Sequence, residues 1–254
     1  MGNLFNPDNR FFTFMGKVAD LMVLNLLCIL CCLPIVTIGP SITAIFYVTL
    51  KMVRGEETYI AKNFFHSFKD NLRQGIIIHL IMVVIGAVLA FDLYFCWQLK
   101  SSITSLKYLS YVFATLGIIY LMVFMYIYPL LAKFSNTIKN TFKNALLISI
   151  RHFPKTLLMI VITALPLAAM IFNSTVMVWG FLFFLMLGFS TIAYINSTFF
   201  VNIFDNYIPE SEKSNPEDTE WKPLEFDESE VPESQTASDA AAQEIFSEDN
   251  TSEN

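Results

Sequence analysis

The sequence predicts an all-α protein: a polytopic helical membrane protein with about six membrane segments, two cytoplasmic amphipathic linker helices and a disordered acidic tail. Three observations lead to this fold class. Hydrophobic residues make up 55% of the chain, which has 25 phenylalanines and a mean hydropathy of +0.54. Long runs without charge recur along residues 1–204, whereas residues 205–254 have the opposite composition. Uncharged apolar runs of this kind are typical of transmembrane helices.

The charge of the chain divides it into two domains. Residues 1–204 hold 14 Lys and Arg against 6 Asp and Glu, a net charge of +8, whereas residues 205–254 hold 2 against 16, a net charge of −14. The overall charge of −6 averages these two unlike parts. We therefore predict a helical membrane domain over residues 1–204. Residues 205–254 have too few large apolar side chains to offset chain entropy, which predicts a disordered acidic cytoplasmic tail.

The first two segments form a predicted hairpin, Val18–Leu33 and Ser41–Val53, around the stretch PIVTIGPS. At 1.5 Å per residue these helices are roughly 24 Å and 20 Å long, shorter than the hydrocarbon core of about 30 Å. Pro34 ends the first helix, and Pro40 suits the first turn of the second. We therefore expect unpaired backbone groups between the helices, which protein or a water-filled pocket must surround.

Four later segments complete the count of six: Ile76–Trp97, Tyr108–Ala132, Thr156–Phe172, which Pro166 is expected to kink, and Val176–Val201. With the N-terminus inside, twelve Lys and Arg outside the tail fall on the inner side, and only Lys100 and Lys107 fall on the outer side. The positive-inside rule then predicts that both termini are cytoplasmic.

Two linkers on the predicted inner side have amphipathic helical patterns. The first places Phe64, Phe65, Phe68 and Leu72 on one face and Lys62, Lys69 and Arg73 elsewhere; the second places Ile138, Phe142 and Leu146 against Lys139 and Lys143. We expect both helices to lie in the membrane interface, where anionic lipid favours Lys and Arg. The alternative is a docking surface for a cytoplasmic partner. Because each linker precedes a span, they also indicate a weak internal repeat.

Polar residues inside the predicted spans each need a partner. Asn25 is expected to bond between helices, as are Asn196 and Asn202. Asp20 is interpreted as an interfacial helix cap, His79 as a neutral hydrogen-bonded ring, and Asp92 as a side chain near the outer boundary that reaches water.

No catalytic signature accompanies these residues. The sequence has no H-E-x-x-H, G-x-S-x-G, Walker A or Rossmann motif. The four cysteines Cys28, Cys31, Cys32 and Cys96 lie in apolar runs, which favours small buried residues over a zinc site. We therefore expect no enzymatic activity, no cofactor and no metal.

The break in the first hairpin is the candidate ligand or interaction site. The start of its second helix presents a partial positive charge, and broken helices at membrane depth often form binding sites in transporters. Thr37, Ser41 and Thr43 add hydroxyls, Gly39 allows close approach of a ligand or of neighbouring backbone, and Asn25 lies about two turns below. The alternative is a tight proline turn packed against neighbouring helices.

The stretch CCLPIVTIGPSITAIFYVTLKMVRGEE, with the preceding DLMVLNLL and the following FFHSFKDNLRQG, resembles the YesL family of bacterial integral membrane proteins, a domain of unknown function. The spaced pattern Asp20, Asn25, Pro34, Thr37, Gly39, Lys51 and Arg54 carries the resemblance. It continues more weakly at YPLLAKFSNTIKNTFKNALL and RHFPKTLL and does not include the tail. It implies a multi-pass protein of the bacterial plasma membrane without an established activity, often encoded near carbohydrate-uptake genes.

Three functions compete on these grounds. The first is a non-enzymatic accessory or regulatory component of carbohydrate (solute) uptake, with the lipid bilayer and a sugar-uptake permease complex as partners and no nucleic acid. The second is a small-solute transporter or channel with its site at the broken first hairpin. An intramembrane enzyme fits least, because no nucleophile–base or metal constellation is present in the sequence.

Overall fold

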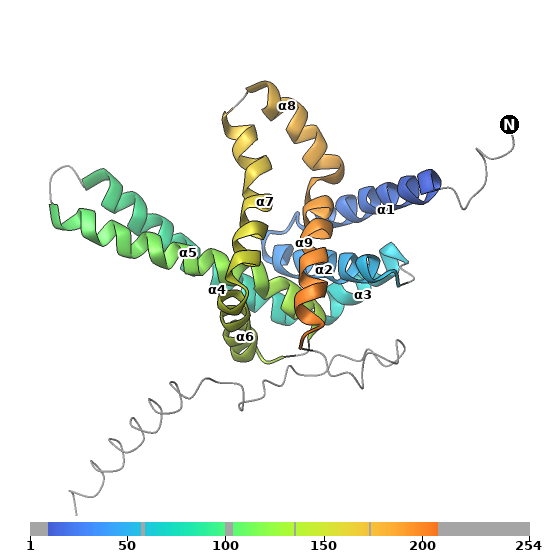
Figure 1. The fold of residues 1–254 in the computed structure, drawn as a ribbon, viewed down its shortest axis with the longest axis horizontal. Coiled ribbons are helices and arrows are strands. Elements are labelled where there is room, and N and C mark those ends of the chain that lie inside the picture. Colours follow the sequence, from blue (N-terminus) through green and yellow to red (C-terminus); the bar gives the residue numbers. More distant parts are fainter. Residues whose placement is uncertain (1–9, 57–58, 100–103, 135, 173, 208–254) are drawn as a thin grey trace, which may run out of the picture. The chain divides into compact units, whose positions relative to one another are not determined.

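The computed structural model describes residues 10–56, 59–99, 104–134, 136–172 and 174–207, and every regular element in these ranges is helical. Figure 1 shows them in chain order. They are α1 (Arg10–Cys31), the 3₁₀ turn η1 (Ile35–Thr37), α2 (Ile38–Arg54), α3 (Ile60–Asp70), α4 (Leu72–Leu99), α5 (Thr104–Lys133), α6 (Ile138–Arg151), α7 (Phe153–Phe172), α8 (Ser174–Phe183), the π-helix η2 (Phe184–Gly188) and α9 (Phe189–Phe204). The predicted all-α class is confirmed.

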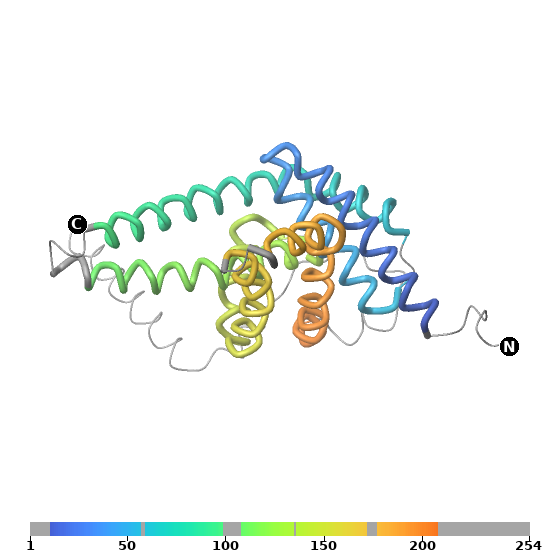
Figure 2. Tube along the Cα trace, turned by 90° about the horizontal axis from the view of Figure 1, so that it is seen from above, coloured from blue at the N-terminus to red at the C-terminus, as the bar shows by residue number. Residues whose placement is uncertain are grey.

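Six helical stretches of the described chain are long and apolar enough to cross a membrane, which confirms the polytopic membrane fold. They are Phe11–Cys31, Ile35–Arg54, Leu72–Gln98, Tyr108–Lys133, Phe153–Ile171 and Met177–Phe204. The last combines α8, η2 and α9. Helices α4 and α5 run alongside each other, as Figure 2 shows.

The predicted bounds of the first helix were wrong. Helix α1 begins at Arg10 rather than Val18 and has 22 residues, so it is about 33 Å long and matches the hydrocarbon core. The prediction began the helix after Lys17 because it treated this charge as a boundary. One exposed lysine does not interrupt a membrane helix, because its long side chain can reach the interface. The expectation that this helix is too short to span comfortably is therefore contradicted.

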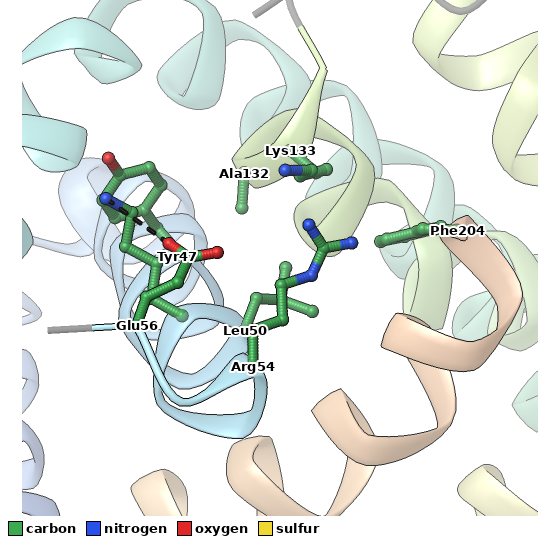
Figure 3. Close-up of a pocket in the computed structure, with 8 residues that line it drawn as sticks. Tyr47, Leu50, Arg54, Glu56, Ala132, Lys133 and Phe204 are labelled. Atoms are coloured by element: carbon green, nitrogen blue, oxygen red, sulfur yellow. Dashed lines mark ion pairs between the residues drawn. The ribbon is translucent and has the colours of Figure 1, made fainter. Parts of the chain in front are cut away.

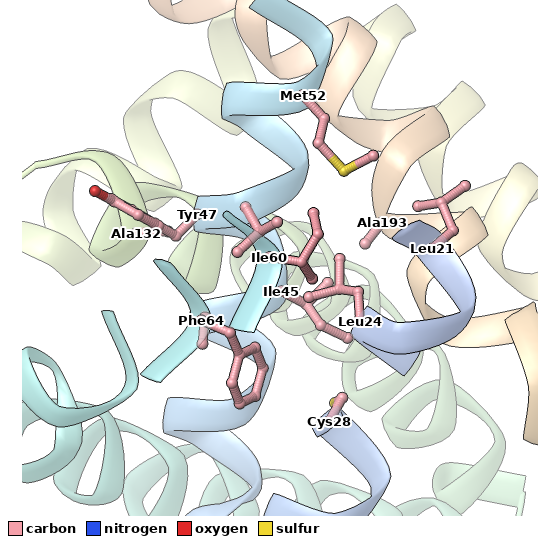
Figure 4. Packing of buried hydrophobic residues seen from close by; sticks show 12 residues of the cluster. Leu21, Leu24, Cys28, Ile45, Tyr47, Met52, Ile60, Phe64, Ala132 and Ala193 are labelled. Atoms are coloured by element: carbon pink, nitrogen blue, oxygen red, sulfur yellow. The ribbon is translucent and has the colours of Figure 1, made fainter. Parts of the chain in front are cut away.

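Helix α2 lies at the centre of the described helices. In its most apolar stretch 61% of residues are buried, compared with 11–22% in the other five spans. It contacts α1, α3, α4, α5 and α9. Leu24 of α1 and Phe64 of α3, both labelled in Figure 4, are fully buried in the core that these helices share. Val48 of α2 is fully buried in the same core. The outer faces of the other spans remain apolar and exposed, as expected of helices that lipid surrounds.

The two amphipathic linkers are helices, α3 and α6, and each is joined to the next span by one residue. Asn71 joins α3 to α4, and His152 joins α6 to α7. The buried positions also correspond at a constant offset: Ile60, Phe64 and Ser67 in α3 match Thr141, Ala145 and Ile148 in α6. Each unit of the internal repeat therefore has three helices: a span, the linker helix and a second span. The first unit is α2, α3 and α4, and the second is α5, α6 and α7.

The predicted apolar faces of these linkers differ from the buried faces. In α3, Phe64 is buried as predicted, but Phe65 is exposed. In α6 the predicted face of Ile138, Phe142 and Leu146 is not the buried one, because α6 packs through smaller and more polar residues and Leu146 is exposed. Lipid is as apolar as a protein core, so an apolar face in such a helix does not identify its packed side.

The tail predicted over residues 205–254 lies almost wholly outside the described residues. Asp205, Asn206 and Tyr207 continue directly from α9 through backbone hydrogen bonds to its last turn. The predicted disorder of the rest stays a prediction.

Candidate functional site

The break between α1 and α2 is a hydrogen-bonded turn. The Thr37 hydroxyl lies 2.6 Å from the Cys31 carbonyl oxygen and 2.8 Å from that of Pro34. The Pro34 carbonyl also accepts the Thr37 backbone N–H at 3.0 Å. The Cys31 carbonyl is one that the end of α1 leaves without a helical partner, and the Pro34 carbonyl lies at the start of η1. The expectation of unpaired connecting backbone is therefore wrong for these groups.

The other two hydroxyls of the candidate site also bond to backbone. Ser41 donates to the Thr37 carbonyl at 2.8 Å, and Thr43 donates to the Gly39 carbonyl at 3.0 Å. Both side chains are fully buried. This geometry favours the packed turn over a ligand site, because each hydroxyl hydrogen is already used within the turn or the first turns of α2.

Gly39 allows the backbone of α2 to lie close to the backbone of α4, as one of the two alternatives for this glycine predicted. A Cβ atom added at Gly39 would lie 2.5 Å from the Gly75 carbonyl oxygen and 2.6 Å from the Cβ of His79, both on α4. His79 in turn lies with its Nδ1 2.9 Å from the Tyr128 hydroxyl on α5, as expected of a hydrogen-bonded ring. The glycine therefore sets the distance between α2 and α4.

A measurement on Thr37 separates the two interpretations of the break. The variant Thr37→Val/Ser41→Ala keeps the shape and removes two hydroxyls. Because both hydroxyls bond to backbone, we expect it to lose about 1–2 kcal/mol of stability in denaturant unfolding in detergent. The variant Thr37→Ser should retain most of the stability. An unchanged stability combined with lost growth on a carbohydrate would instead favour a ligand site.

Asn25 bonds between helices as predicted, but to a partner that the sequence did not indicate. Its Nδ2 donates to the carbonyls of Phe184 and Leu185 at 3.1 and 2.8 Å, and its Oδ1 accepts the Ser190 backbone N–H at 3.2 Å. The Ser190 hydroxyl donates back to the Leu21 carbonyl at 2.7 Å. We call this set the Asn25 staple. It joins α1 to the π-helix and the start of α9.

The Asn25 staple explains how a π-helix persists in a membrane span. A π-turn shifts backbone hydrogen bonds out of the α-helical pattern, and lipid offers no substitute partner. The Asn25 amide supplies both donors and an acceptor at this point. Asn25 therefore bonds to the last span, whereas Gly39 of the break packs on α4. The structure does not bring Asn25 and the residues of the break together in one site.

Of the other predicted interhelical amides, Asn196 is confirmed and Asn202 is not. Asn196 of α9 donates to the Thr163 hydroxyl of α7 at 3.0 Å. Asn202 donates to the Thr198 carbonyl of its own helix at 3.0 Å and is exposed. No local pattern distinguishes these two asparagines, because only the rotation of α9 decides which amide meets α7.

A charge cluster lies where α2, α5 and α9 end together. Arg54 bonds to Asp205, and the Lys51 ammonium lies 3.8 Å from the Glu56 carboxylate and 5.1 Å from the centre of the Tyr47 ring. Figure 3 shows Arg54 reaching from α2 toward Lys133 and Phe204. We define the charge cluster as Lys51, Arg54, Glu56, Lys133 and Asp205.

Four members of the charge cluster, Lys51, Arg54, Glu56 and Lys133, line a cavity of about 20 Å³, which has room for about one water molecule. Three helix C-termini meet here, and their partial negative charges favour the three cations, while the two carboxylates offset the remaining charge. The arrangement therefore joins helix ends and leaves no room for a sugar ring. These cations served to assign topology, and Lys51 and Arg54 also belong to the family resemblance, but no sequence pattern predicted that they cluster. Their position at the ends of spans was the available signal.

The Arg54–Asp205 pair is expected to contribute modestly. The side chains are 21% and 46% exposed, so solvent screens the pair, and a double-mutant cycle should give a coupling of at most about 1 kcal/mol. Arg54→Asp should therefore lower stability slightly, and Arg54→Asp/Asp205→Arg should restore it. A swap that unfolds as readily as Arg54→Asp alone would contradict the pairing.

The junction of α6 and α7 contacts the chain after α9. His152 Nε2 lies 3.4 Å from the Tyr207 hydroxyl, and the Arg151 guanidinium lies 5.7 Å from the centre of the Tyr207 ring. Burial, followed by the charges of Lys155 and Arg151, lowers the pKa of His152. His152 is therefore neutral at pH 7.

The part of the chain that the structure describes holds no group of potential metal ligands. No three or more His, Cys, Asp or Glu residues there come together as ligands for a metal ion. Cys28, Cys31, Cys32 and Cys96 are free thiols, and the sulfur of Cys28 in α1 lies 3.7 Å from that of Cys32, which directly follows the helix.

Comparison with known proteins gives a match to one family over part of the chain, and that family has no known activity. Residues 21–93 match the family described as "Protein of unknown function, DUF624". The matched region holds the Asn25 side of the staple, the break, α2, α3 and most of α4. No curated protein and no solved structure matches the chain.

Proposed function

We propose that this protein, whose residues 21–93 match the DUF624 family of unknown function, acts without catalysis as an accessory or regulatory membrane component of carbohydrate uptake. In this proposal it contacts a permease partner through one basic surface. That surface is the outer side of α3 together with the charge cluster at the end of α2.

The observation that carries the proposal is the exposed face of α3. Lys62, Phe65 and Lys69 are exposed there, and His66 lies 2.8 Å from Asp70. The opposite face packs on α1 and α2. A helix that is charged, solvated and fixed to the most buried span is suited to transmit contact with another protein to the membrane core. The positive-inside rule assigns this side to the cytoplasm.

Two further observations support an accessory role over transport by this chain alone. The hydroxyls of the break bond to neighbouring backbone, and the charge-cluster cavity holds about 20 Å³. Neither presents polar groups and space for a sugar. The choice of carbohydrate as the solute class rests on the resemblance to the YesL family, whose members are often encoded near carbohydrate-uptake genes.

Crosslinking from native membranes tests the proposal. A photoreactive residue at Lys62 or Lys69 should capture a permease subunit, and Lys62→Glu/Lys69→Glu should abolish both the capture and growth on the transported carbohydrate. The matched control is Lys139→Glu/Lys143→Glu on α6, which should retain both. Capture of no permease component would contradict the proposal. Solute flux by the purified protein in liposomes would favour the transporter alternative.

A further inference from the structure

The outward stripe of α6 combines lysines with large aliphatic side chains. Lys139 and Lys143 occupy its first half, and Leu146, Leu147 and Ile150 occupy its second half. These five positions follow helical spacing along one face. The aliphatic residues are 38%, 45% and 58% exposed, whereas the opposite face packs on α5 through Thr141, Ala145 and Ile148. The protein therefore leaves the most apolar side of α6 uncovered.

Helix α3, which corresponds to α6 in the internal repeat, packs in the same way without aliphatic residues at the positions of Leu147 and Ile150. At the constant offset of the repeat, His66 and Lys69 of α3 occupy the positions of Leu147 and Ile150 in α6. The buried faces of the two helices correspond. On the outer faces Leu146 matches the exposed and apolar Phe65, so the difference between polar and aliphatic residues lies at the positions of Leu147 and Ile150. The difference indicates different surroundings for the two helices.

The neighbouring span indicates what surrounds α6. Helix α7 follows after His152 alone, and its exposed residues Phe153, Leu157 and Leu158 continue the aliphatic surface of α6 into a membrane span. The second half of α6 is the part closest in sequence to this span, so it is the part that hydrocarbon would reach first. Lys139 and Lys143 lie at the other end of the same stripe, and anionic headgroups at a membrane surface attract ammonium groups.

We propose that the outward stripe of α6 (Lys139, Lys143, Leu146, Leu147 and Ile150) binds anionic phospholipid. The two lysines contact headgroup phosphates, and the three aliphatic side chains insert among the acyl chains. The outer face of helix α3 remains in water. In this proposal α6 therefore contacts lipid, and the equivalent helix α3 is free to contact a protein partner. This inference does not depend on the proposed function, because it concerns the purified protein in a bilayer.

A spin-label experiment tests the position of the stripe. In full-length protein whose four native cysteines are replaced by alanine, a nitroxide is attached at Leu147→Cys or at the matched position His66→Cys, after confirmation of unchanged helicity and melting. In phosphatidylglycerol-containing vesicles, the label at 147 should collide with oxygen and exclude a water-soluble nickel complex, and the label at 66 should do the reverse. A nickel-accessible label at 147 overturns the proposal, as does one shielded from both reagents by protein.

Lipid selectivity tests the lysines and distinguishes a headgroup from a free anion. Wild-type protein should retain phosphatidylglycerol over phosphatidylcholine in native mass spectrometry, and each of Lys139→Gln and Lys143→Gln should reduce this preference about fivefold. Lys62→Gln/Lys69→Gln on α3 is the matched control and should leave it unchanged. An equal loss in the α3 variant overturns the proposal. Displacement of the lipid by inorganic phosphate alone would identify a small-anion site and also overturn it.

Discussion

Gly39→Ala is expected to destabilise the protein by about 3 kcal/mol, at the upper end of overpacking effects. The added methyl would lie 2.5 Å from the Gly75 carbonyl oxygen and 2.6 Å from the Cβ of His79. Neither is the end of a flexible side chain, so α2 and α4 must separate to admit the methyl group. Because α2 is the most buried span, the separation would disturb its other contacts as well. Denaturant unfolding in detergent, followed by helical circular dichroism, measures the loss.

The matched control is Gly117→Ala in α5. The nearest atom to the added carbon there is the Cδ1 of Leu93 at 3.9 Å, an ordinary contact. Alanine is also favoured over glycine in a helix by up to about 1 kcal/mol, so this variant should be as stable as the parent or slightly more stable. If Gly39→Ala behaves like Gly117→Ala, the backbones of α2 and α4 do not meet at this point.

Asn25→Leu is expected to cost about 2–3 kcal/mol. Hydrogen bonds between helices in a membrane contribute about 0.6 kcal/mol on average and up to about 1.7. Asn25 makes three of them at 2.8–3.2 Å, and its side chain is fully buried. Leucine of similar size would leave the Phe184 and Leu185 carbonyls and the Ser190 N–H without this partner. Part of the loss should appear as a change in the last span, because the π-helix then has no external donor.

Asn202→Leu is the control for Asn25→Leu. Its amide donates only within α9, to Thr198, and is exposed, so we expect a change within about 0.5 kcal/mol. Both variants replace an asparagine by leucine in a membrane helix, so the comparison removes the general effect of added hydrophobicity. Equal unfolding free energies for the two variants would show that the Asn25 staple contributes nothing to the fold.

The sequence by itself determined the helices and their number. Six apolar runs and two linkers with helical periodicity are local properties, and hydropathy and spacing report them directly. The same reasoning placed Pro40 in the first turn of α2 and identified the Thr37–Gly39 region as a break. It misjudged the start of α1 because it treated Lys17 as a boundary.

Only the tertiary structure decided which faces pack and which partners the buried polar groups take. In water the apolar side of a helix is its buried side, but next to lipid an apolar side chain is equally stable outside, so α6 packs through Thr141 and Ala145 and exposes Leu147. A buried Asn25 amide predicts a hydrogen-bond partner, but the sequence does not indicate which one. The partner is the backbone of a π-helix, and no sequence pattern predicted that π-helix. The Arg54–Asp205 pair likewise joins residues far apart in the chain, and it exists only because α2 and α9 end side by side.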